Sequence, residues 1–193
     1  DAQVAHTANG ILKFLGLARY YQRFIPHLAE MAQPLTSLLR KERNPKKDWG
    51  KKQDQAVIDI KNAFLNDVLL VHFDNTRQTV LTTDASDHAL GAVLSQIVEG
   101  EERPVCFLSK TMDRHQVNST GTEKECLAVV WATEIHQTLL KGITFTIETD
   151  HEALKYLISI KESVGRLARW AMKLQEFDMK VKYRKGEENG AAD

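Results

Sequence analysis

The spacing of hydrophobic residues divides the chain into a helical first part and a second part of strands and helices. The sequence "ANGILKFLGLARYYQRFI" places apolar side chains three and four residues apart, so residues 8–25 are predicted to form an amphipathic helix. Pro26 is expected to end or kink this helix. Residues 34–41 and 54–70 predict two further helical pieces, and the basic segment 41–52 is interpreted as a linker.

After "HFDNTRQ" the spacing becomes typical of strands. Residues 79–84, 91–98 and 103–110 are rich in β-branched and apolar residues, and residues 99–102 ("EGEE") predict a hairpin turn. Three consecutive strands joined by short turns are expected to be antiparallel.

A long helix over residues 122–141 comes next, and Gly142 lies at its end. The strand at 143–150 should then lie parallel to the first strand, since a helical crossover connects the two. The remaining pattern predicts helices at 151–158 and 164–177, a strand at 179–185, and a helix beginning within 186–193. The second part therefore has the order β-β-β-α-β-α-α-β-α, which indicates an α/β fold with a mixed five-stranded sheet flanked by helices and preceded by a small helical segment.

Two strands of this sheet end on aspartate. "VLTTD" ends at Asp84 and "TIETD" ends at Asp150, and Glu125 is expected in the first turn of the intervening helix. If the two strands are parallel neighbours, their ends lie about 5 Å apart, at the sheet edge where functional sites collect. Three carboxylates that meet there repel one another unless a cation neutralises them, and oxygen ligands favour Mg²⁺ or Mn²⁺. Two such ions can promote hydrolysis of a phosphodiester.

Each of these residues also has an ordinary structural explanation. Asp150 is well placed to cap the following helix, and Glu125 to interact with a helix dipole. Asp87 has the sequence context of a turn residue. The ordered set of strand aspartate, helix glutamate and strand aspartate favours a metal site more than any one member does.

Composition narrows the class of protein. The 193 residues include 26 basic and 26 acidic side chains, so binding to nucleic acid would depend on local patches. Seven basic residues lie within 40–52 and eight within 161–185, and each run taken alone is more readily interpreted as a solvated face. The two cysteines, Cys106 and Cys126, suit a reducing compartment and the protein core. The sequence contains neither a signal peptide nor an apolar run long enough to span a membrane, so a secreted or membrane protein is not expected.

Several motifs resemble those of a known family. "FLGLARYYQRFIPHLAEMAQPLTSLL", "TDASDHALGAVLSQ", "TEKECLAVVWA", "TDHEALKYL" and "GRLARWAMKLQEFDMKVKYRKGEEN" occur in the order found in the pol polyproteins of gypsy-like LTR retrotransposons. The resemblance covers the region after the polymerase palm and extends through the ribonuclease H domain. It implies a helical thumb and linker segment at residues 1–75 and a ribonuclease H-like domain at 76–193.

The family resemblance also implies a function and its residues. It implies cleavage of the RNA strand of RNA–DNA hybrids by two Mg²⁺ ions, which Mn²⁺ may replace. The implied metal ligands are Asp84, Glu125, Asp150 and Asp193, the last of which spacing alone does not identify. Tyr183 corresponds to a position where many ribonucleases H carry a histidine near the departing product.

Implied partners follow from the same resemblance. They are an RNA–DNA hybrid, the polymerase palm and fingers of the same polyprotein, and a second reverse-transcriptase chain as a candidate dimer partner. A basic helix that carries Arg166, Arg169 and Lys173 on one face is a candidate surface for nucleic-acid phosphates. The expected location is a cytoplasmic virus-like particle or the nucleus.

The chain departs from the family pattern in three ways. The Y-x-D-D motif of the polymerase is absent, so the chain alone is not expected to synthesise DNA. The segment before Glu125 reads "NSTGTEKE" where the family commonly has "NYSTTEKE". The sequence given stops at Asp193, so the helix expected to hold this ligand is cut short.

Two other functions compete with nuclease activity. A domesticated or subunit-like fragment would bind nucleic acid or a partner chain without cleaving it. An integrase or transposase shares the fold but needs the order D-D-E, whereas Glu125 here comes second. The order of the three acidic residues therefore argues against an integrase.

Overall fold

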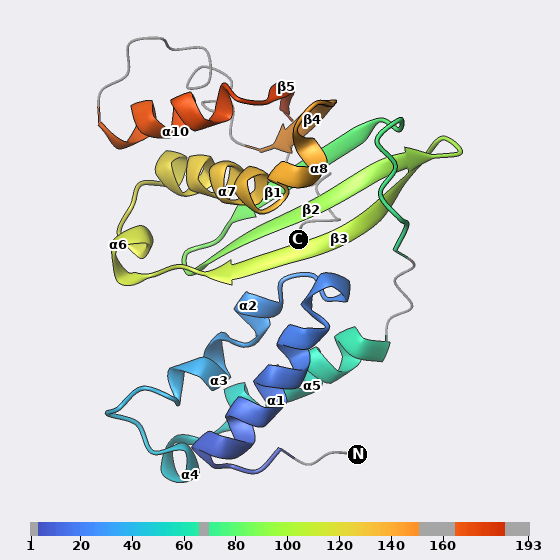
Figure 1. The fold of residues 1–193 in the computed structure, drawn as a ribbon. Helices are drawn as coiled ribbons and strands as arrows, with labels where there is room; N and C mark the ends of the chain where they lie inside the picture. Colours follow the sequence, from blue (N-terminus) through green and yellow to red (C-terminus); the bar gives the residue numbers. More distant parts are fainter. Residues whose placement is uncertain (1–3, 66–69, 151–164, 184–193) are drawn as a thin grey trace.

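The molecule consists of a helical segment packed beneath a sheet that carries further helices on its other face (Figure 1). The computed structural model describes residues 4–65, 70–150 and 165–183. The helices predicted at 151–158 and within 186–193 lie outside the described residues, as does Asp193. Within the described part, no helix has the length and apolar character that a membrane span requires.

The helical segment has its own hydrophobic core. Helix α1 begins after Thr7, whose hydroxyl accepts a hydrogen bond from the Gly10 amide at 3.1 Å. Its buried face and the buried face of α5 meet, so the predicted amphipathic spacing is confirmed for both helices. The segment contains α1 (Ala8–Tyr20), the 3₁₀ helix η1 (Gln22–Phe24), α2 (Leu28–Met31), α3 (Gln33–Ser37), α4 (Pro45–Asp48) and α5 (Lys51–Leu65). The core residues are Ile11, Leu15, Ala18, Ile25, Leu28, Ala32, Leu35, Leu38, Ala56 and Ile60.

Two predictions for this segment were wrong in detail. The interpreted linker 41–52 contains α4, because the Asn44 side chain accepts a hydrogen bond from the Lys46 amide and Pro45 suits the first helical turn. The first helix ends at Tyr20, before the proline, and the chain turns through η1 and α2. The Asn44 cap therefore stabilises a short helix that the spacing of hydrophobic residues did not predict.

The five strands form one mixed sheet in the order β3-β2-β1-β4-β5. The first three strands are antiparallel neighbours, and β4 lies parallel to both β1 and β5. The predicted mixed sheet and the predicted parallel pairing of the first and fourth strands are therefore confirmed. The strands are β1 (Thr79–Ala85), β2 (Ala89–Val98), β3 (Glu101–Thr111), β4 (Thr144–Thr149) and β5 (Asp178–Tyr183).

The predicted turn between β2 and β3 is shorter than four residues. Val98 pairs with Glu101, so only Glu99 and Gly100 form the turn, with φ angles of 54° and 85°. Positive φ at both turn residues matches the twist of two-residue hairpins.

Helix α7 packs across the sheet on the face opposite the helical segment (Figure 1). The helix predicted over 122–141 is broken at His136, whose buried Nε2 lies 3.4 Å from the Cys106 Sγ. This polar contact with β3 accompanies the start of a separate short helix. The helices on this side are α6 (Arg114–Val117), α7 (Gly121–Ile135), α8 (Gln137–Leu140) and α10 (Arg166–Leu174).

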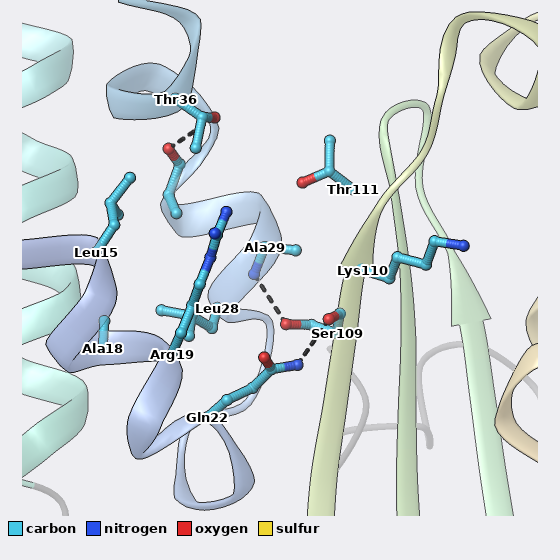
Figure 2. Close-up of a pocket in the computed structure, with 11 residues that line it drawn as sticks. Leu15, Ala18, Arg19, Gln22, Leu28, Ala29, Thr36, Ser109, Lys110 and Thr111 are labelled. Atoms are coloured by element: carbon cyan, nitrogen blue, oxygen red, sulfur yellow. Dashed lines mark hydrogen bonds between the residues drawn. The ribbon is translucent and has the colours of Figure 1, made fainter. Parts of the chain in front are cut away.

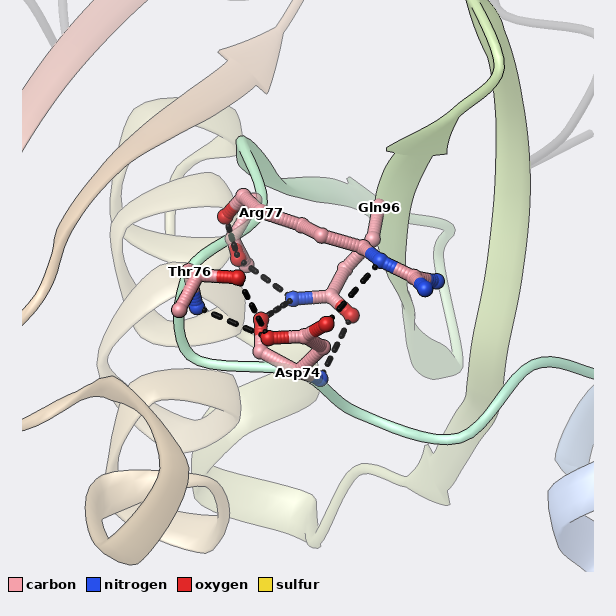
Figure 3. Close-up of polar contacts among 5 residues, drawn as sticks. Asp74, Thr76, Arg77 and Gln96 are labelled. Carbon is pink, nitrogen blue, oxygen red and sulfur yellow. Dashed lines mark hydrogen bonds and ion pairs between the residues drawn. The ribbon is translucent and has the colours of Figure 1, made fainter.

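A polar turn holds the start of β1 in register (Figure 3). The Asp74 carboxylate accepts hydrogen bonds from the amide and hydroxyl of Thr76 and pairs with Arg77 at 3.2 Å. Gln96, fully buried on β2, donates to the Asp74 carbonyl at 2.7 Å and to the Thr79 hydroxyl at 3.0 Å. The buried Gln96 side chain of β2 therefore links the turn and β1 to β2 by hydrogen bonds.

The helical segment contacts the sheet through specific hydrogen bonds at β3 (Figure 2). The Gln22 side-chain amide donates to the Ser109 carbonyl at 2.7 Å, and the Ser109 hydroxyl accepts from the Ala29 amide at 2.9 Å. The His27 ring lies 3.7 Å from where a Cβ on Gly91 would be. These contacts place η1 and α2 against the end of the sheet that carries Asp84.

Substitution by alanine should change the free energy of unfolding in opposite directions at Gly100 and Gly16, because their backbone angles differ. Neither Gly100 nor Gly16 has a neighbour within 4 Å of an added Cβ, but only Gly100 has positive φ. Gly100→Ala should lower the free energy of unfolding by about 1 kcal/mol, and Gly16→Ala, within α1, should raise it by roughly 0.5–1 kcal/mol. Urea denaturation measures both changes, and a shift of the same sign at the two positions would contradict this interpretation.

Candidate active site

The parallel pairing of β1 and β4 brings two predicted site residues to the same edge of the sheet. Thr82 pairs with Glu148, so Asp84 and Asp150 each lie two residues beyond a matched pair. Asp84 is partly buried and Asp150 is exposed. The structure thus places both aspartates at the carboxyl ends of adjacent strands, as the sequence predicted.

Helix α7 directs Glu125 toward the two aspartates. A capping box starts this helix: the Thr120 hydroxyl accepts from the Glu123 amide at 3.3 Å, and the Glu123 carboxylate accepts from the Thr120 amide at 3.0 Å. Because the helix begins at Gly121, Glu123 is the acidic residue of the first turn, and the expectation that Glu125 lies there was wrong. Glu125 lies further along, and only 7% of it is exposed.

The Glu125 carboxyl is in an unfavourable environment for a negative charge. Burial, as the largest cause, and the negative charges of Asp84 and Asp150 together raise its pKa from 4.5 to about 8. A hydrogen bond from the Ala85 backbone opposes this shift. The buried Glu125 Oε2 has no hydrogen-bond partner within the described residues. An unpaired buried carboxyl oxygen beside two further carboxylates calls for a neutralising group.

This donor set fits a hard divalent cation. Its three members offer only oxygen ligands, and the Glu125 Oε2 is the orphaned atom such a cation would satisfy. Taken by themselves, the described residues contain no group of three or more histidine, cysteine, aspartate or glutamate side chains arranged as a metal site. The fourth implied ligand, Asp193, lies outside the described residues.

Asp87, interpreted from sequence as a turn residue, differs from Asp84 in its surroundings. Its side chain is 91% exposed and lies 3.5 Å from the Lys124 ammonium group. Asp87 is therefore a matched control for substitutions at Asp84.

Tyr183 lies at the same edge of the sheet as Asp150. It ends β5 and pairs with Thr149, the residue directly before Asp150. The tyrosine is 43% exposed. This position puts its side chain on the strand next to the candidate site.

The three basic residues predicted on one face of α10 are Arg166, Arg169 and Lys173, and two of them already contact other side chains. The Arg166 guanidinium donates to the Ser119 hydroxyl at 3.2 Å, and the Lys173 ammonium pairs with Glu134. Arg169 is exposed and makes no ion pair within the described residues. A role in phosphate binding remains a prediction for all three, and Arg169 is the best placed.

The helical segment contributes residues that sequence reasoning missed. His27 and Glu30 line two cavities together with Asp84. His27 has φ of 49°, which is uncommon for a residue other than glycine. No sequence signal connects residues so far apart, although left-handed backbone often occurs near functional sites.

Comparisons with known proteins agree with this geometry. Residues 74–177 match the family model described as the RNase H-like domain found in reverse transcriptase. The chain is 42% identical over 184 residues to the retrovirus-related Pol polyprotein from transposon 297 of Drosophila melanogaster, covering 95% of this chain and 17% of that protein. It is 37% identical over 186 residues to the transposon Tf2-3 polyprotein of Schizosaccharomyces pombe, covering 94% and 14%. The chain therefore spans less than a fifth of these relatives.

Solved structures show the same fold. The foamy viral protease-reverse transcriptase dRH in complex with double-stranded DNA matches with a TM-score of 0.77 and 20% identity, covering 96% of this chain and 33% of that one. The foamy viral protease-reverse transcriptase in complex with an RNA/DNA hybrid matches with a TM-score of 0.70 and 21% identity, covering 93% and 25%. The match extends over the helical segment as well as the sheet.

The raised pKa of Glu125 predicts how stability depends on pH. The folded state binds a proton more tightly than the unfolded state, so the stabilising contribution is complete below about pH 4.5 and is lost as pH rises through about 8. Without divalent cations, the free energy of unfolding should fall over this range by an amount on the order of a few kcal/mol. Glu125→Gln should flatten the dependence, as measured by urea denaturation at several pH values.

Adding Mg²⁺ at pH 8 should raise the melting temperature of the wild type and have little effect on Glu125→Gln, because the cation stabilises the charged carboxylate. Glu102→Gln, at an exposed position on β3, is the control and should behave as wild type. Identical pH profiles for wild type and Glu125→Gln would refute the assignment of the raised pKa to this residue.

Proposed function

The chain belongs to the family of RNase H-like domains found in reverse transcriptases, and on that premise we propose that it is part of a retrovirus-related Pol polyprotein, as its relatives are, and that it hydrolyses the RNA strand of RNA–DNA hybrids. The observation that carries the proposal is the buried, unpaired Glu125 carboxyl beside Asp84 and Asp150. A structural relative that was solved with an RNA/DNA hybrid supports the choice of substrate.

The proposed ligands for two Mg²⁺ ions, or Mn²⁺ in their place, are Asp84, Glu125, Asp150 and Asp193. When bound, such ions supply activation of a water molecule and stabilisation of the leaving oxygen. The sheet and α7 hold the carboxylates of Asp84, Asp150 and Glu125 at one edge before any ligand arrives, and the Ala85 amide donates a hydrogen bond to Glu125. Tyr183, beside Asp150, is proposed to lie near the departing product, where its hydroxyl can donate a hydrogen bond.

The proposed organisation follows the same family membership. Residues 1–75 act as the thumb and linker of the polymerase, and residues 76–193 form the nuclease domain. The hybrid, the palm and fingers of the same polyprotein, and a second reverse-transcriptase chain are the proposed partners. A cytoplasmic particle or the nucleus is the proposed location.

Asp84→Asn should lower the rate of RNA cleavage in a hybrid by roughly 100-fold or more, because it removes one of the preorganised charges of the site. The measurement is gel analysis of a hybrid with a labelled RNA strand, with Mg²⁺ or Mn²⁺. Asp87→Asn, three residues away and exposed, is the matched control and should cleave as wild type does.

Equal cleavage by wild type and Asp84→Asn would show that the site is wrongly assigned. If the wild type binds the hybrid but leaves it intact at saturating Mg²⁺, the function is binding without cleavage, as expected for a domesticated or subunit-like fragment.

A further inference from the structure

A second polar cavity lies where the helical segment meets the end of β3. Its volume is about 580 Å³, and both layers of the molecule line it. Arg40 and Gln33 contribute from the helical segment, and His88, Thr111 and Arg114 from the sheet and α6. The site exists only where these two parts of the chain pack together.

The charges around this cavity are unbalanced. Two arginines and a histidine line it, and no aspartate or glutamate does so among the described residues. Neither Arg40 nor Arg114 makes an ion pair within the described part of the chain, although Arg77, Arg103 and other basic residues do. Like charges that converge without a partner raise the energy of the site until an anion binds.

The acidic residues directly next to Arg114 and His88 in sequence contact other groups. Asp113, next to Arg114, accepts hydrogen bonds from the amides of His115 and Gln116, both at 2.8 Å. Asp87, next to His88, faces Lys124. Neither carboxylate forms an ion pair with Arg40 or Arg114 within the described residues.

Hydrogen bonds stabilise the frame of the cavity. The Met112 amide donates to the His88 carbonyl at 2.8 Å, which joins the β1–β2 turn to the end of β3. On the opposite wall, the Thr36 hydroxyl bonds to the Ala32 carbonyl at 3.1 Å, and Leu38 is buried beside it. A rigid frame lowers the entropy cost of binding.

The cavity lies at the same end of the sheet as the candidate active site. His88 follows Asp84 by four residues and belongs to the turn after β1. A neighbouring cavity of about 300 Å³ shares Thr36 and Thr111 with it and adds Arg19 (Figure 2). Figure 2 shows Arg19 extending from α1 in the direction of Thr36, whereas Lys110 points to the other side of β3. Exposed arginines thus follow the junction between the two layers.

We propose that Arg40 and Arg114 bind the phosphodiester backbone of a nucleic-acid strand that also reaches the candidate active site. Guanidinium groups donate paired hydrogen bonds to phosphate oxygens, and Thr111 and His88 offer further donors. This inference rests on the proposed function for the identity of the ligand. It adds a site that the helical segment and the ribonuclease H-like sheet form together.

The experiment measures binding of a fluorescently labelled RNA–DNA hybrid by anisotropy, in EDTA so that no cleavage occurs, at several salt concentrations. Arg40→Ala and Arg114→Ala should each weaken binding several-fold and reduce the slope of log affinity against log salt by about 1, since each removes one phosphate contact. Arg114→Lys, which keeps the charge, should restore most of the affinity.

Arg103→Ala is the control, because Arg103 is half-buried at the opposite end of β3 and pairs with Glu101. Its affinity and salt slope should equal those of the wild type. Thermal denaturation of every variant verifies that the fold is intact, as expected for exposed or half-buried side chains.

Wild-type affinity and salt slope in both Arg40→Ala and Arg114→Ala would overturn the proposal, as would losses equal to that of Arg103→Ala. Weakened binding to an acidic peptide with unchanged binding to the hybrid would also overturn it, in favour of a protein partner. A wild type that shows the arginine-dependent binding but never cleaves would refute the nuclease function and leave this site standing.

Discussion

The parallel pairing of β1 with β4 is the constraint on which the candidate site depends. The two strands are separated in sequence by two hairpin strands and a long helix, yet their register puts Asp84 and Asp150 at matching positions. The crossover helix α7 must then lie across β1, and this brings Glu125 to the same edge. A shift of one residue in this register would turn every side chain of the shifted strand to the other face of the sheet.

The same packing creates an electrostatic cost. Glu125 is placed in a buried environment beside two negative charges, so its pKa rises and one of its oxygens stays unpaired among the described residues. A structural role would be better served by an apolar side chain of similar size at this position. A buried carboxyl that destabilises its own ionised form is typical of sites whose ligand supplies the missing interaction.

The helical segment contributes residues to cavities that it forms together with the sheet. Its contacts with Ser109 accompany a cavity that His27, Glu30 and Asp84 line, and a second cavity that Arg40 and Arg114 line. The chain therefore has an acidic region at the strand ends and a basic cavity at the junction, within one rigidly bonded end of the sheet. A polyanion such as a nucleic-acid strand can bind at the basic cavity, whereas cations can bind at the acidic region.

The sequence by itself determined the order of elements, the mixed sheet and the strand ends at Asp84 and Asp150, because hydrophobic periodicity and crossover handedness are local or topological rules. It also separated Asp87 from Asp84. It did not place the break at His136, the two-residue turn at Gly100 or the start of α7, since these depend on single hydrogen bonds and backbone angles. Tertiary structure alone decided the burial of Glu125, the contacts that occupy Arg166 and Lys173, and the placement of Arg40 and Arg114 at one cavity, because each arises from packing between segments distant in the chain, which no local pattern records.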